Sequence, residues 1–178
     1  MRFRILTHLV AGTALTLSFA GSASAQMTEK PLLGAGISFL HETDATGKGF
    51  AVDLAQNIRS MDKVAVGIVG DFGLSHFSDI GTVTTFQGGV RATFTTSNPK
   101  VKPFAQGIAG LAHFSASNCT GSFCSENDFV FSPGGGVDVM LNDQYNFRAE
   151  LDFPIVRSNG VTSNDTRFWF GISLLLGK

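Results

Sequence analysis

One short motif in this chain combines residue types that can carry out acyl transfer. His113 and Ser115 are separated by a single phenylalanine, and Glu126 follows further along the chain. A histidine activates a serine as a nucleophile when a carboxylate orients the imidazole ring. The same tripeptide recurs as His76-Phe77-Ser78, which favours a chance repetition. We therefore expect no catalytic residues and no enzyme, and hydrolysis at His113, Ser115 and Glu126 is kept as an alternative.

The cysteine pair is a second group with chemistry to consider. Cys119 and Cys124 lie in a polar segment that has the composition of a loop. In an exported chain such a pair is expected to form a disulfide. A metal site usually needs four ligands, and His113 is the only further candidate close in sequence. We expect neither a metal nor any other cofactor.

The first 25 residues have the pattern of a secretory signal peptide. Arg2 and Arg4 provide a positive start, residues 5–20 are largely apolar, and Ala23-Ser24-Ala25 is a small-residue cleavage site. Cleavage after Ala25 leaves residues 26–178, which is the length of one domain. The predicted organisation is a cleaved signal at 1–25 followed by a single domain at 26–178.

Charge and hydropathy exclude several classes of protein. The whole chain has 13 basic and 14 acidic residues, and loss of Arg2 and Arg4 leaves a slightly acidic domain. That balance does not favour nucleic acid as a partner. No later segment has the 18 or more uninterrupted apolar residues that a membrane-spanning helix needs. If the chain spans a membrane, we expect it to do so with strands.

Eight segments alternate between apolar and polar residues, which is the period of a β-strand with two different faces. The predicted strands are 33–42, 48–57, 64–77, 82–96, 101–117, 129–141, 145–155 and 166–176. The connections after the even strands look short, and those after the odd strands look longer or more polar. An even strand count with this asymmetry is typical of an up-and-down transmembrane barrel.

The composition of the two faces separates a membrane barrel from a soluble one. Small residues dominate the face that carries the charges, including Gly34, Ser38, Ala51, Gly67, Gly73, Gly134 and Ser173. Such residues suit the crowded interior of an eight-stranded barrel. The chain has 17 Phe, too many for so narrow an interior, so we expect the Phe-rich face to contact lipid. Trp169 falls on the inner face by this count.

Aromatic residues near the strand ends are expected to form girdles at the two membrane interfaces. We predict Phe94, Phe104, Tyr145 and Phe147 at the turn end, and Phe39, Phe131 and Phe168 at the loop end. Strand 101–117 is the one with an unclear face, since Phe104, Ile108 and Phe114 share a side with Gln106. If those three apolar residues face lipid, His113 and Ser115 point into the lumen.

Charged residues on the predicted inner face need partners, because a buried charge without one is costly. The predicted lumen charges are Asp53, Asp71, Arg91, Asp138, Arg148, Glu150, Asp152 and Arg167. We expect a fixed network of ion pairs that fills the barrel. A narrow ion path is the alternative.

The strand number, the loop asymmetry, the Gly-rich strand 103–110 and the final strand 169–176 resemble the small eight-stranded outer-membrane barrels of the OmpA/OmpX and opacity-protein type. The resemblance implies an all-β, eight-stranded antiparallel up-and-down transmembrane β-barrel in a Gram-negative outer membrane. It also implies a monomer surrounded by outer-membrane lipid, with a structural or surface-interaction role and an extracellular ligand or partner at its loops.

Two alternatives to this interpretation remain. His113, Ser115 and Glu126 resemble the motif of the outer-membrane lipid A deacylases, which are also eight-stranded barrels. A soluble periplasmic lipid-binding barrel would show the same alternation, but its Phe-rich face would be turned inward.

Overall fold

The computed structural model describes residues 30–78, 80–117, 125–158 and 160–177, and the regular structure in these ranges is entirely β-strand. The strands are β1 (Leu32–Glu42), β2 (Ala45–Met61), β3 (Val64–Phe77), β4 (Gly81–Phe94), β5 (Val101–Ala116), β6 (Ser125–Met140), β7 (Tyr145–Asp152), β8 (Ile155–Ser158), β9 (Val161–Asn164) and β10 (Thr166–Leu175). Among the described residues no helix is long and apolar enough to cross a membrane.

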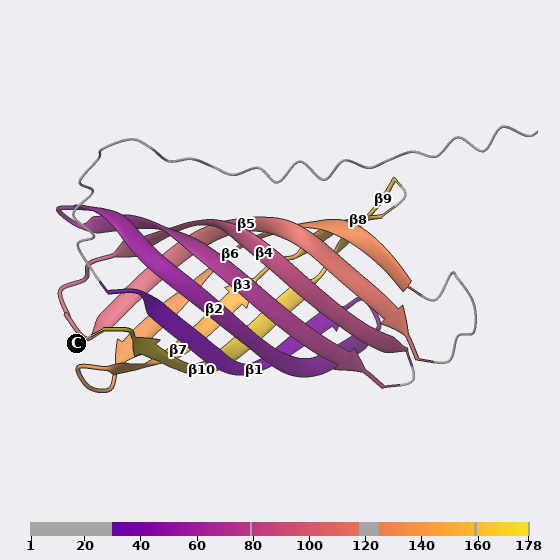
Figure 1. The fold of residues 1–178 in the computed structure, drawn as a ribbon, viewed down its shortest axis with the longest axis horizontal. Coiled ribbons are helices and arrows are strands. Elements are labelled where there is room, and N and C mark those ends of the chain that lie inside the picture. Colours follow the sequence, from indigo (N-terminus) through magenta and orange to yellow (C-terminus); the bar gives the residue numbers. More distant parts are fainter. Residues whose placement is uncertain (1–29, 79, 118–124, 159, 178) are drawn as a thin grey trace, which may run out of the picture.

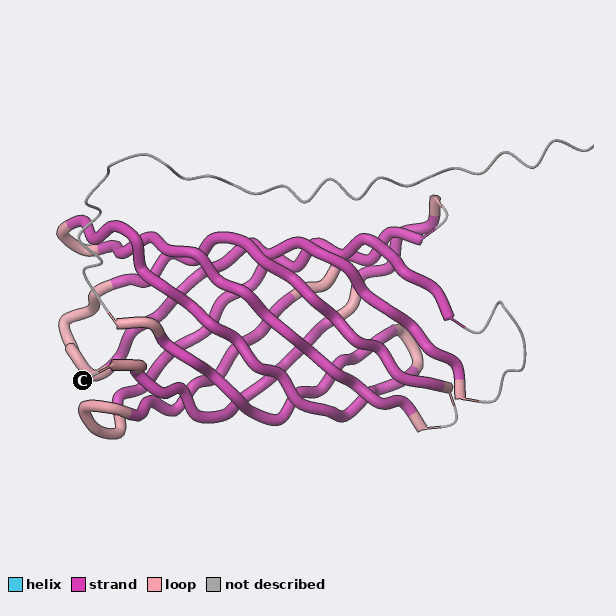
Figure 2. The backbone as a smooth tube through the Cα atoms, viewed as in Figure 1, coloured by secondary structure: helices cyan, strands magenta, loops and turns pink. Residues whose placement is uncertain are grey.

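Eight of these strands form a closed ring, and its barrel shape can be followed in Figures 1 and 2. Antiparallel neighbours follow the order β1, β2, β3, β4, β5, β6, β7 and β10, and β10 returns to pair with β1. The closing ladder runs from the pair Leu32–Leu175 to the pair His41–Thr166. Because the ring closes, none of its eight strands is left at an open sheet edge. The predicted eight-stranded up-and-down barrel is confirmed.

The barrel has two ends with different connections. At the terminal end, the Leu176 N–H donates to the Pro31 carbonyl beside the β2–β3, β4–β5 and β6–β7 turns. The loop end carries the β1–β2, β3–β4, β5–β6 and β8–β9 connections. The predicted difference in length does not hold everywhere. The pair Glu42–Ala45 extends the β1–β2 ladder and leaves only residues 43–44 between the strands, whereas the β4–β5 turn spans 95–100.

A proline interrupts the seventh predicted strand. Pro154 lacks an N–H and separates the end of β7 from the start of β8. β8 then pairs with β6 on one side and with β9 on the other, and Gly160 at φ 86° lies in the connection of that hairpin. The segment 158–165, expected to be a loop, therefore contains strand β9.

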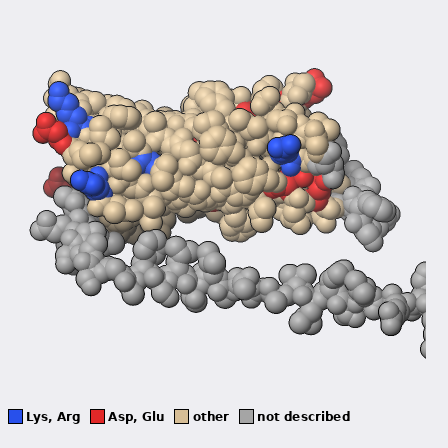
Figure 3. All heavy atoms as spheres, turned by 90° about the horizontal axis from the view of Figure 1, so that it is seen from above, with Lys and Arg blue, Asp and Glu red and all other residues tan. Residues whose placement is uncertain are grey.

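The two faces of the ring have opposite polarity. Along β4, Phe86 and Val90 are 62% and 60% exposed on the outside, whereas Gln87 and Arg91 are buried inside. The same alternation follows the other ring strands, and Trp169 is fully buried on the inside, as predicted. On the side shown in Figure 3, charged residues gather toward the two ends and the middle is mostly uncharged.

The assignment of β5 corrects one prediction. Phe104 and Ile108 are 4% and 0% exposed, and both point into the barrel, whereas Leu111 is 58% exposed on the outside. Phe104 is therefore not part of an outer aromatic girdle. The outer face of β5 instead carries small residues such as Ala105, Gly107 and Ala109. The Phe131 ring on neighbouring β6 lies 3.7 Å from where a Cβ on Gly107 would be.

A matched pair of glycine substitutions tests the inner packing. A Cβ at Gly34 would overlap the Asp53 carboxylate and lie 3.2 Å from the Trp169 ring, whereas a Cβ at Gly70 on the outer face meets no heavy atom within 4 Å. We expect Gly34→Ala to lower the free energy of unfolding by about 1–3 kcal/mol and Gly70→Ala to change it by less than about 0.5 kcal/mol. Urea unfolding of the refolded protein, followed by the fluorescence of its single tryptophan, measures both. Equal losses would contradict the inward packing of Gly34.

Candidate functional site

The structure places all eight charged residues predicted for the inner face inside the barrel, and each is at most 5% exposed. Strand pairing brings many of them together. Asp138 lies opposite Arg148 on β6 and β7, and Asp152 lies opposite Arg167 on β7 and β10. Strand register alone therefore places opposite charges side by side on the inner wall, and the contacts across the lumen add to these pairs.

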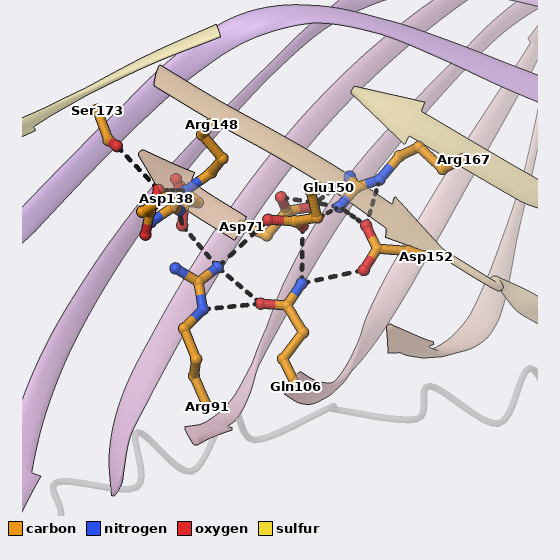
Figure 4. Close-up of polar contacts among 10 residues, drawn as sticks. Asp71, Arg91, Gln106, Asp138, Arg148, Glu150, Asp152, Arg167 and Ser173 are labelled. Carbon is orange, nitrogen blue, oxygen red and sulfur yellow. Dashed lines mark hydrogen bonds and ion pairs between the residues drawn. The ribbon is translucent and has the colours of Figure 1, made fainter. Parts of the chain in front are cut away.

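Arg148 forms the cluster nearest the terminal end (Figure 4). Its Nε and Nη2 donate to the two carboxylate oxygens of Asp138, both at 2.6 Å, in a bidentate pair. Its Nη1 donates across the lumen to Asp53 on β2. Asp53 also forms an ion pair with Nη2 of Arg91 at 2.8 Å, so one carboxylate joins two arginines.

Arg167 forms the second cluster, nearer the loop end (Figure 4). Its Nη1 and Nη2 donate to the two carboxylate oxygens of Asp71 at 2.7 and 3.1 Å. Nη2 also lies 2.8 Å from Asp152 and 3.6 Å from Glu150. One guanidinium therefore compensates three carboxylates, from β3 and β7, which uses the fixed fork of donors that arginine provides.

Gln106 on β5 joins the two clusters. Its carbonyl oxygen accepts from Arg91 Nε and Nη2 at 2.9 and 2.6 Å, and its amide nitrogen donates to Glu150 and Asp152 at 2.8 and 3.0 Å. Gln106 was not predicted to belong to the network. Its inward position opposite Arg91 on β4 is the signal that would have indicated this role.

Phe104 forms cation–π contacts with two of the arginines. The centre of the Arg91 guanidinium lies 4.3 Å from the Phe104 ring centroid, and that of Arg148 lies 4.9 Å away. An aromatic face attracts a cation through its quadrupole, and the attraction strengthens where water is excluded. An aromatic residue on the inner face thus has a defined place in the network.

The arrangement favours a filled lumen over an ion path. Guanidinium groups from β4, β7 and β10 reach carboxylates on β2, β3, β6 and β7, so the ion pairs cross the interior. An eight-stranded barrel has an interior that side chains just fill.

A cavity of about 170 Å³ lies inside the loop end. Part of its wall is apolar, with Leu40, Val83, Phe114, Val130 and Val156 among the lining residues, and Arg167 also lines it. Glu42, Asp128 and Asp165 add three carboxylates, and the ion pairs among the described residues do not include them. Burial raises the pKa of the Asp165 carboxyl, and hydrogen bonding with Ser163 opposes this rise.

The structure does not assemble the candidate acyl-transfer motif. His113 and Ser115 are exposed on the outer face, and His113 Nδ1 lies 2.8 Å from Asn127 Oδ1. The expectation that they point into the lumen was wrong, because β5 turns its other face inward. Glu126 pairs with Phe114 on the opposite face and accepts a hydrogen bond from Ser158 at 2.8 Å.

The predicted disulfide cannot be placed, because Cys119 and Cys124 lie outside the described residues. Within the described residues no group of three or more His, Cys, Asp and Glu side chains has an arrangement that could hold a metal ion.

Comparison with known proteins identifies the fold. No family model and no curated protein matches the sequence. Among solved structures, Neisserial surface protein A matches with a TM-score of 0.58 at 14% identity, covering 82% of this chain and 96% of that one. Ail of Yersinia pestis, solved with the heparin analogue sucrose octasulfate, matches at 0.56 and 15%, covering 83% and 97%.

The N-terminal β-barrel domain of Pseudomonas aeruginosa OprF also matches, with a TM-score of 0.56 at 14% identity, covering 83% of this chain and 98% of that one. These likenesses show that the chain has the fold of the small outer-membrane β-barrels.

Removal of one arginine tests the network. Arg148→Met leaves Asp53 and Asp138 buried without their main partner, and we expect a loss of about 3–5 kcal/mol in the free energy of unfolding. Arg157→Met removes an exposed arginine on β8 and should cost less than about 0.5 kcal/mol. Urea unfolding of the two refolded variants measures the difference. A loss at Arg148 no larger than that at Arg157 would contradict a network that stabilises the barrel.

Proposed function

We propose that this protein is an outer-membrane β-barrel of the Gram-negative type, exported by a signal peptide at residues 1–25, with a structural or surface-interaction role and no enzymatic activity. The observation that carries the proposal is the polarity of the barrel. Large apolar side chains lie outside, and the eight predicted lumen charges lie inside. Residues 1–29 lie outside the described residues, so the signal peptide rests on the sequence pattern alone.

The outer surface supports a location in lipid. The described residues include 22 exposed large apolar side chains, among them Ile68, Phe86 and Phe129. Soluble proteins rarely expose apolar patches of more than a few hundred Å². A barrel that bound lipid from water would turn these side chains inward. Strands of 14–17 residues, as in β2 to β5, are long enough to cross an outer membrane.

The two ends of the barrel would then face different compartments. The terminal end lies in the periplasm, and the loop end, with its cavity, lies outside the cell. We propose that an extracellular partner or ligand meets the protein at this loop end, since loops on a rigid scaffold can vary without disturbing it.

The charge of the loop-end cavity limits the kind of ligand. Ail was solved with the polysulfated sucrose octasulfate. Here Glu42, Asp128 and Asp165 line the cavity and would repel such a polyanion. Its partly apolar wall and its carboxylates favour a ligand with an apolar body and a positive charge.

Cell fractionation tests the location directly. We expect expressing cells to yield the protein in the outer-membrane fraction, where it should migrate faster on a gel before boiling than after it. Recovery in the soluble periplasm, with no change in gel mobility on boiling, would refute the proposal. It would favour the alternative of a soluble periplasmic lipid-binding barrel.

A pair of arginine substitutions on one strand tests which face contacts lipid. Phe86 lies mid-strand on the outer face of β4, and we expect Phe86→Arg to disfavour folding into lipid vesicles by roughly 2–4 kcal/mol. Thr82→Arg changes the same face near the loop end, where the cost falls to about 0–1 kcal/mol. The fraction folded after dilution from urea into vesicles, taken from gel mobility, measures both. Equal costs at the two positions would contradict a lipid-facing β4.

The Cys119–Cys124 disulfide remains a prediction from the sequence. We expect protein isolated from the envelope to resist thiol alkylation until it is reduced, and then to gain the mass of two alkyl groups. Alkylation of both cysteines without reduction would exclude the disulfide.

A further inference from the structure

A second, smaller cavity lies inside the terminal end of the barrel. Its volume is about 50 Å³, and a cavity needs only about 10–15 Å³ to hold one water molecule. The cavity therefore has room for a small polyatomic ion. Its polar lining is formed by Lys30, Asn57, Arg91, Thr93, Lys102, Asp138, Asn146 and Arg148.

Positive charge exceeds negative charge in this lining. Lys30, Lys102, Arg91 and Arg148 are cationic. The acidic groups that face them are Asp138, in the lining, and Asp53, which pairs with both arginines, so the two lysines carry the excess. Asp138 is already engaged, because it accepts two hydrogen bonds from Arg148 and one from Ser173 at 3.2 Å. Neither lysine belongs to an ion pair among the described residues.

Arg91 supplies an independent sign of a missing acceptor. The residue is 3% exposed, its Nε and Nη2 both donate to Gln106, and Nη2 also forms an ion pair with Asp53. Its Nη1 is buried and has no hydrogen-bond partner. In Figure 4 the guanidinium nitrogen of Arg91 without a dashed line points away from Gln106, and Arg91 lines the cavity. A buried donor without an acceptor is uncommon in folded proteins, because its loss of hydration is not repaid.

We propose that this cavity binds a small oxyanion, either a free ion such as phosphate or sulfate or the carboxylate group of a larger molecule. Arg91 Nη1 donates to the anion from inside the barrel, and Lys102 and Lys30 neutralise it at the mouth. Charge-assisted hydrogen bonds from arginine and lysine are the contacts that oxyanions form most strongly in proteins. The site goes beyond the proposed surface role, because it lies at the opposite end from the loops.

The lining of the loop-end cavity explains why the anion would bind only at the terminal end. There Glu42, Asp128 and Asp165 line the cavity together with a single arginine, Arg167, which is already paired with Asp71 and Asp152. An anion that entered from that side would meet an excess of negative charge.

The test is a calorimetric titration of the full chain, folded in an uncharged detergent, with inorganic phosphate at constant ionic strength. We expect saturable binding to one site, weakened about tenfold or more by Lys102→Gln, because that variant removes one charge-assisted hydrogen bond. Lys48→Gln, on the outer face near the loop end, should bind phosphate as the unmodified protein does. Gel mobility before and after boiling verifies that each variant is folded.

Lys30→Gln provides a second variant, since Lys30 is exposed and precedes β1, so the ring does not depend on it. We expect it to weaken phosphate binding in the same direction as Lys102→Gln. Competition of acetate with phosphate would identify carboxylate groups as ligands. Competition by sulfate but not by acetate would restrict the site to tetrahedral ions. No saturable binding to the folded barrel, or an identical response to phosphate and chloride in all variants, would overturn the proposal and leave water as the acceptor for Arg91.

Discussion

The closed hydrogen-bond ladder between β1 and β10 is the constraint on which the rest of this structure depends. Each strand of the ring pairs its backbone N–H and C=O groups on both sides, as a barrel in lipid would require, because lipid offers no alternative partner. Eight strands meet this requirement in a ring whose interior is only as wide as its side chains. Large apolar residues are therefore placed outside, and the interior holds small residues that leave room for a few long ones, as Gly34 does for Asp53 and Trp169.

The interior charges follow from the same narrowness. Long polar side chains that fill the lumen must satisfy one another's hydrogen-bonding groups, and in so little space one group must serve several partners. Arginine meets both demands, because one guanidinium serves several carboxylates in fixed geometry, as Arg167 does for Asp71 and Asp152. Phe104 and Gln106, on a single strand, then supply an aromatic surface and a bridging amide. The loop end and the terminal end keep unequal charge, so the two mouths of the barrel differ chemically.

Most of the fold could be predicted from the sequence, because a period of two is a local signal. The segment 64–77 is β3 without adjustment, and the inner position of Trp169 follows from its neighbours. β5 could not be assigned in this way, since Phe104 and Leu111 lie on opposite faces and both are apolar. The partners of the inner charges were also beyond the sequence, because contacts across the lumen depend on ring closure. The lengths of the loop-end connections were misjudged because polar residues there continue the strand ladders.

Two of the ion pairs that cross the lumen join residues far apart in the chain. Arg148 and Asp53 are 95 residues apart, and Arg167 and Asp71 are 96 apart. Neither pair can form until strands from both halves of the chain have come together. A partly assembled ring would hold unpaired charges in an interior that is being closed off from water, which is an unfavourable state. The network thus stabilises the complete barrel more than any arrangement in which the two halves of the chain have not yet met.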